Sequence, residues 1–176
     1  PIAVETAPGI LCRQVWRPIE TCGLYVPAGS APLVSTLIML AAPAAVAGVP
    51  NRVLVSPASK SGETHPAIIA AAAACGIEAI WRVGGAQAIA ALTFGAILPK
   101  AEKIFGPGNA YAAEAKRFAA ALHGGPAVDL PAGPSELAVV ADASADAALI
   151  AADLLSQAEH DADAQVLLIS PSEELL

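Results

Sequence analysis

The chain has 176 residues, of which 56% are hydrophobic and 14% charged, and its formal net charge is −7. This composition excludes an intrinsically disordered protein and is typical of a globular chain with a large core, in one domain or two small ones. The sequence contains no basic stripe, so we expect it to bind neither nucleic acid nor an anionic membrane surface.

The cysteines indicate the cellular compartment. Cys12, Cys22 and Cys75 are scattered without CxxC spacing, and we see no signal peptide. This favours structural thiols in a reducing compartment, the cytoplasm. The longest apolar run, residues 31–49, is interrupted by polar residues and a proline, which predicts a buried helix instead of a membrane span. The chain begins without Met and stops early in a new segment, so we expect it to be truncated at both ends.

In chain order, short apolar strands alternate with helices. Strands are predicted over residues 15–19, 23–26, 52–56, 78–83, 103–105, 128–130, 136–141 and 165–170. Helices are predicted over residues 33–42, 66–74, 86–94, 109–122 and 144–158. Pro43 is expected to kink or restart the first helix, and Thr64 to cap the second. The alternation is typical of right-handed βαβ units on a parallel sheet and predicts an α/β fold.

Glycine-bearing turns follow several of the predicted strands, at residues 27–29, 84–85, 106–108 and 131–134. None is a GxGxxG fingerprint or a phosphate-binding P-loop, although each could bring backbone N–H groups near a ligand. Tyr25, Gln87 and Asn109 stand beside three of these turns. Their polar groups could bind a ribose or an adenine edge; alternatively, Asn109 is a helix N-cap and Gln87 a solvated first-turn residue.

Two further candidate sites lie later in the sequence, one at Ser135 and one at Gln157 and His160. The hydroxyl of Ser135 could contact a substrate or belong to an ordinary turn, and no nucleophile elbow surrounds it. Gln157 and His160 share one face of the last predicted helix, where Gln157 continues a stripe through Leu154 and Ile150. Buried polar side chains need partners, which predicts a metal ion or a polar ligand; alternatively, both residues cap the helix end.

Five stretches, in this order, resemble the histidinol dehydrogenases. They are Gly23-Leu24-Tyr25-Val26-Pro27 through Ala31, Val83-Gly84-Gly85-Ala86-Gln87-Ala88, Ile104-Phe105-Gly106-Pro107-Gly108-Asn109, Asp129-Leu130-Pro131-Ala132-Gly133-Pro134-Ser135-Glu136, and Asp153-Leu154-Leu155-Ser156-Gln157-Ala158-Glu159-His160. The resemblance runs from about residue 15 to the end of the chain.

The resemblance implies a function. That family oxidises L-histidinol to L-histidine, reducing two NAD in succession, with zinc binding the substrate. By motif, Tyr25, Gln87 and Asn109 would contact NAD. Ser135 would contact the substrate, and Gln157 and His160 would bind both zinc and the substrate. The family's other zinc ligands, an Asp and a His, and its Glu-His acid–base pair lie further downstream. We therefore expect no catalytic residue in this chain and no activity from it alone.

The resemblance also implies an architecture of two Rossmann-like units with flanking helices, one inserted in the other. Residues 1–24 would lead into the first domain, 25–134 would form the inserted domain, and 135–176 would return to the first. The parent protein would be a homodimer. Two alternatives stay open: a related NAD- and zinc-dependent dehydrogenase of another small polyol or amino alcohol, and a non-catalytic nucleotide-binding α/β module.

Overall fold

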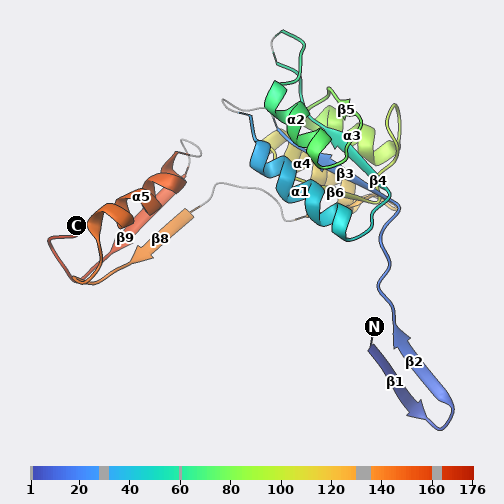
Figure 1. Cartoon of the computed structure of the whole chain (residues 1–176), viewed down its shortest axis with the longest axis horizontal. Helices are drawn as coiled ribbons and strands as arrows, with labels where there is room; N and C mark the ends of the chain where they lie inside the picture. Colours follow the sequence, from blue (N-terminus) through green and yellow to red (C-terminus); the bar gives the residue numbers. More distant parts are fainter. Residues whose placement is uncertain (1, 28–31, 60, 130–135, 160–163) are drawn as a thin grey trace. The chain divides into compact units, whose positions relative to one another are not determined.

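The computed structural model describes residues 2–27, 32–59, 61–129, 136–159 and 164–176. Contacts divide the chain into an N-terminal unit, Pro1–Ala132, and a C-terminal unit, Gly133–Leu176. Figure 1 labels the helices and strands of the two units. The predicted nesting of one domain inside the other stays a prediction.

A five-stranded parallel sheet forms the centre of the N-terminal unit. Its strand order is β5-β4-β3-β6-β7, where the strands are β3 (Thr21–Tyr25), β4 (Asn51–Val55), β5 (Ile80–Trp81), β6 (Lys103–Phe105) and β7 (Ala127–Val128). The chain builds outward from β3 through β4 to β5, then crosses back to β6 on the other side of β3. In open parallel sheets, ligands bind beyond the carboxyl ends of the strands where the strand order reverses. Here that point lies between β3 and β6, at Tyr25 and Gly106.

Helices cover both faces of this sheet (Figure 1). One core cluster joins α1 (Val34–Val46) and α2 (Pro66–Ala74) to Leu24 and Leu54. The other joins α3 (Gly85–Phe94) and α4 (Ala110–Ala121) to Tyr25, Val53 and Val55. Because successive strand residues point to opposite faces, β3 is buried throughout and β4 is buried from Val53 to Val55, as expected for parallel strands between two helical layers.

The N-terminal segment differs from the prediction. Residues 15–19 form no strand; instead β1 (Ile2–Ala7) and β2 (Ile10–Gln14) pair as an antiparallel hairpin. Pro18 has no N–H to give to a sheet, which disfavours the predicted strand. The signal for the hairpin was Pro8-Gly9 between two runs with apolar residues, and Gly9 adopts the positive φ of 79° that suits a tight turn.

Three helix ends also differ. Helix α1 continues through Pro43 to Val46. His65, not Thr64, caps α2, because its Nδ1 accepts the N–H of Ala67 at 3.2 Å. Helix α5 (Ala147–Ala158) begins three residues later than predicted, because the Asp146 carboxylate accepts the N–H of Ala148 at 2.8 Å and so sets its start.

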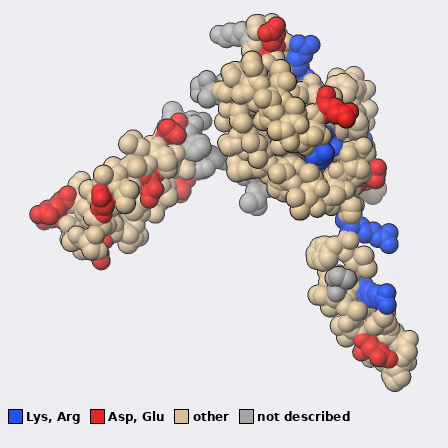
Figure 2. Space-filling model, in the orientation of Figure 1, with Lys and Arg blue, Asp and Glu red and all other residues tan. Residues whose placement is uncertain are grey.

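The C-terminal unit is one βαβ motif, in which β8 (Glu136–Val140) and β9 (Gln165–Ile169) pair in parallel and α5 connects them. Its sequence holds nine of the sixteen acidic residues and none of the nine Lys and Arg residues. Figure 2 accordingly shows red acidic side chains on this unit, while the blue side chains belong to the N-terminal unit. In the part of the chain that the structure describes, no helix is both long enough and apolar enough to cross a membrane.

Candidate functional site

Tyr25 ends the central strand β3 at the switch point of the sheet. Its side chain packs into the core on the α3–α4 side and is only 3% exposed. The phenol oxygen nevertheless reaches a polar partner, because it accepts the backbone N–H of Gly85 at 3.1 Å. Gly85 is the first residue of α3, where N–H groups lack a partner within the helix. Tyr25 thus ties the strand end to the start of a helix.

The turn after β6 packs closely on the same tyrosine. Gly106 has a φ of 120°, and a Cβ there would lie 1.9 Å from the Tyr25 carbonyl oxygen. A Cβ on Gly108 would lie 2.6 Å from the Ala112 Cβ and 3.5 Å from Tyr25 Cε1. Both glycines are therefore required by close approach, and the turns that open α3 and α4 both contact Tyr25.

Gln87 and Asn109 lie at the starts of these two helices, and both side chains are exposed. Gln87 is in the first turn of α3. Asn109 is the N-cap of α4, since its Oδ1 accepts the N–H of Ala112 at 3.0 Å. The structural alternative for Asn109 is thus confirmed, but the cap uses only the oxygen, and the amide NH₂ of this exposed side chain is not used by the cap. Tyr25, Gln87 and Asn109 therefore lie along one edge of the sheet.

Two residues of this site were not predicted. Lys116 of α4 is buried, and its ammonium group pairs with the Asp129 carboxylate just after β7. The same ammonium donates to the Gly106 carbonyl oxygen at 2.8 Å, and the Gly106 N–H donates to Asp129 Oδ2 at 2.6 Å. A lysine within the otherwise Ala-rich face of α4 was the available sequence signal.

In the C-terminal unit, Gln157 lies in the last turn of α5. Its Nε2 is buried and has no hydrogen-bond partner among the described residues. Such an atom is costly without a partner, and the nitrogen and oxygen of an amide are assigned by modelling, so either end can face this position. Ser135 and His160 lie outside the described residues. Within the described ranges, no three or more His, Cys, Asp or Glu side chains gather as a metal site.

The shifted pKa values belong to groups away from this edge. Burial raises the pKa of the Cys22 thiol, opposed in part by Arg52. On exposed surface, a hydrogen bond from Arg117 lowers the pKa of Glu114 and raises that of Arg117, and hydrogen bonds from Ser144 lower the pKa of Asp142. The candidate site therefore rests on hydrogen-bonding geometry, not on titration.

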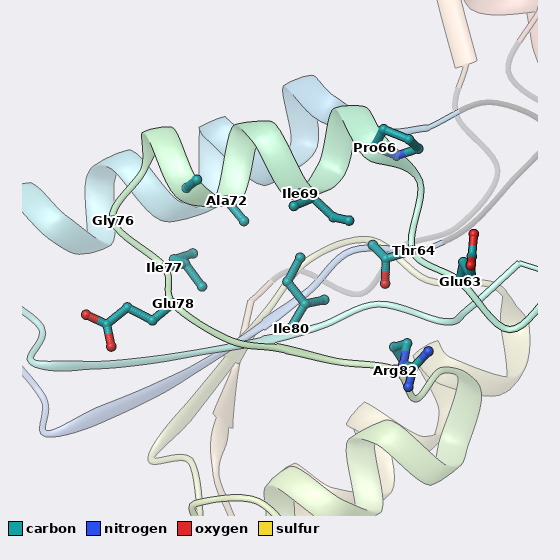
Figure 3. Close-up of a pocket in the computed structure, with 11 residues that line it drawn as sticks. Glu63, Thr64, Pro66, Ile69, Ala72, Gly76, Ile77, Glu78, Ile80 and Arg82 are labelled. Carbon is teal, nitrogen blue, oxygen red and sulfur yellow. The ribbon is translucent and has the colours of Figure 1, made fainter.

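An open groove of about 1000 Å³ lies elsewhere, between α2 and the edge strand β5. Figure 3 shows Ile69 and Ala72 facing Ile77 and Ile80 across an apolar floor, with Arg82 near one end. The described residues that line it include none of the predicted site residues. The groove is therefore separate from the strand-end site.

The family model described as histidinol dehydrogenase matches residues 1–176. The chain is 55% identical to the histidinol dehydrogenase of Xanthomonas oryzae pv. oryzae and 53% identical to that of Salmonella choleraesuis, with 99% of the chain and 40% of each relative covered. The crystal structure of histidinol dehydrogenase from Elizabethkingia anophelis superposes with a TM-score of 0.92 at 50% identity, covering 99% of this chain and 40% of that one. The chain thus spans about 40% of the length of these relatives.

Proposed function

This chain belongs to the histidinol dehydrogenase family, and on that premise we propose that it is part of an NAD- and zinc-dependent enzyme that oxidises L-histidinol to L-histidine. The match to the family over residues 1–176 carries this proposal. The arrangement of Tyr25 against the turns that open α3 and α4 supports the cofactor part of it, because this is the sheet edge where parallel α/β folds bind ligands.

We assign NAD binding to Tyr25, Gln87 and Asn109. The exposed amide of Gln87 can donate and accept hydrogen bonds, and the NH₂ of Asn109 can donate, as a ribose or an adenine edge requires. The Tyr25 oxygen already accepts the Gly85 N–H, so its own proton is available for a ligand. NAD supplies the hydride acceptor; the role of these three residues is to bind and orient it.

We assign zinc binding to Gln157 and His160, and substrate binding to these two residues and Ser135. The buried, unpartnered amide end of Gln157 fits this assignment, because an amide oxygen at that position would gain a partner. Zinc supplies orientation and polarisation of a bound substrate. Catalytic zinc sites have three or more protein ligands, so this pair requires others. We assign no catalytic acid or base to the chain.

The remaining expectations are also proposals. They are the homodimeric state of the whole protein, its cytoplasmic location, and the insertion of the domain of residues 25–134 into the other domain.

A chimera tests the proposed function. Residues 1–176 replace the matching stretch of the Xanthomonas oryzae enzyme, and NADH formation is measured with L-histidinol, NAD and zinc. We expect the chimera to form NADH when histidinol is present. The Gln157→Ala and His160→Ala variants of the chimera should lose both this activity and the bound zinc. Glu114→Ala, on the exposed surface of α4, serves as the control and should leave activity unchanged.

Two results would contradict the proposal. A folded chimera that binds NAD and zinc but forms no NADH with histidinol would refute the substrate assignment. Faster NADH formation with another small polyol or amino alcohol would favour the related dehydrogenase considered above.

A further inference from the structure

The interior of the N-terminal unit contains one ion pair among the described residues. Lys116 is only 4% exposed, within a helix otherwise rich in alanine, and it pairs with Asp129, whose side chain is 27% exposed. Ion pairs in such places add little stability, because apolar residues of similar volume commonly replace them at no cost. The pair therefore calls for an explanation other than stability.

The hydrogen-bond partners of the Lys116–Asp129 ion pair supply this explanation. The Asp129 carboxylate accepts the N–H of Gly106, and the Lys116 ammonium donates to the carbonyl oxygen of the same residue. Both backbone polar groups of Gly106 are thus held by this single ion pair. Gly106 is also where the chain passes closest to Tyr25, with a φ of 120° that only glycine adopts readily.

The position of Gly106 determines which backbone N–H groups the turn can offer to a ligand. The N–H of Gly106 is occupied by Asp129, and Pro107 has no N–H. The backbone donors that the turn can offer a ligand therefore begin at Gly108 and Asn109. Rotation of the Gly106 peptide would move these donors, and with them the Asn109 side chain. The ion pair thus fixes the direction in which this edge of the site faces.

We propose that Lys116 and Asp129 are positioning residues that set the Gly106–Asn109 turn for NAD. This inference rests on the proposed binding of NAD at this edge. Neither residue needs to touch the cofactor; both act through the backbone of Gly106.

The test measures the affinity of the 176-residue chain for NAD by isothermal titration calorimetry, and its fold by thermal unfolding. In the double variant Lys116→Met/Asp129→Leu, apolar side chains replace the pair, so the chain should fold. Its Kd for NAD should nevertheless rise by about tenfold or more, since misplaced contacts weaken binding steeply. Lys116→Arg keeps the charge and the donors, and its Kd should stay within about threefold of the unsubstituted value.

The matched control is the exposed pair on the same helix, Glu114 and Arg117. Glu114→Ala/Arg117→Ala should leave the Kd for NAD unchanged. A folded double variant that binds NAD as tightly as the unsubstituted chain would overturn the inference. If the double variant does not fold, Lys116→Met replaces it, because it removes the donor to the Gly106 carbonyl oxygen and leaves the carboxylate of Asp129, which is partly exposed, in place. Unchanged affinity in that variant has the same meaning. Absence of NAD binding by the unsubstituted chain would instead refute the proposed cofactor site, and this inference with it.

Discussion

The hydroxyl oxygen of Tyr25 accepts the backbone N–H of Gly85 across 60 residues of sequence. This bond joins the end of the central strand to the start of α3, while the Gly106 turn packs against the same residue. A buried side chain thus organises two helix starts, and the exposed amides of Gln87 and Asn109 stand at those starts.

Removal of the Tyr25 hydroxyl should destabilise the chain. In Tyr25→Phe the Gly85 N–H loses its acceptor in a partly buried place, which costs about 1–2 kcal/mol in the free energy of unfolding. Urea denaturation measures the loss. Tyr111→Phe, at a side chain that is 78% exposed, is the control and should change stability by less than about 0.5 kcal/mol. Equal stability of both variants would show that the Tyr25 bond is unimportant.

Gly106 should tolerate no side chain. Gly106→Ala would place a Cβ 1.9 Å from the Tyr25 carbonyl oxygen, so we expect a loss of at least about 3 kcal/mol or failure to fold. Gly124→Ala is the matched control, because Gly124 also has a positive φ, 70°, but nothing lies within 4 Å of its Cβ. That variant should lose only about 1 kcal/mol, the cost of the backbone conformation. Similar losses in both variants would contradict the close approach.

Substitutions of Asn109 should separate its role as a helix cap from its proposed contact with NAD. Aspartate caps a helix as well as asparagine does, so Asn109→Asp should keep stability within about 0.5 kcal/mol, whereas Asn109→Ala should lose about 1 kcal/mol. If the amide also contacts NAD, both variants should bind NAD about tenfold more weakly, a difference of about 1.4 kcal/mol. Thermal unfolding and calorimetric titration measure the two effects. Unchanged NAD affinity in Asn109→Asp would leave Asn109 as a cap alone.

Gln157 should be required for any stabilisation of the chain by zinc. Without metal, Gln157→Met removes a buried unpartnered amide, so stability should stay equal or rise by up to about 1 kcal/mol. With excess zinc, the thermal midpoint of the unsubstituted chain should rise slightly, since we expect two ligands to bind weakly, and that of Gln157→Met should not. Chelation by EDTA should abolish the rise. The control is Gln165→Met, at an exposed glutamine; loss of the zinc response there too would refute the assignment.

The thiols should differ in reactivity. Cys22 is buried, and burial raises the pKa of its thiol above the ordinary value of 9.0. Less of the Cys22 thiol is therefore ionised at a given pH than burial-free conditions would allow, and the buried Cys22 should be alkylated more slowly than the exposed Cys12 until the chain unfolds. Because the unfolded thiol ionises first, the contribution of Cys22 to stability is complete below pH 9.0. It is lost as the pH rises above that value. Mass-spectrometric rates of alkylation across this range test both statements; equal rates for the two thiols would contradict them.

The order of elements from β3 onward followed from the sequence, because apolar strands of a parallel sheet and Ala-rich helices each leave a strong local pattern. The family also followed from it, since five ordered stretches carried the resemblance that the comparisons confirm. The start of the chain was predicted wrongly, because a strand exists only with a partner, and residues 15–19 have none that the structure describes. The caps at His65 and Asp146 depended on which of several neighbouring polar side chains reaches a backbone N–H.

The sequence alone determined that Tyr25, Gln87 and Asn109 stand beside glycine turns at strand ends. Each of these positions follows from the few residues around it and does not depend on which strands are neighbours in the sheet. Only the tertiary structure decided that strand β3 lies between β4 and β6, so that Tyr25 meets both turns. It also decided that Lys116 and Asp129 hold Gly106. Both relationships join residues far apart in the sequence through burial and hydrogen bonds, and no local pattern encodes which distant partners a buried polar group will find.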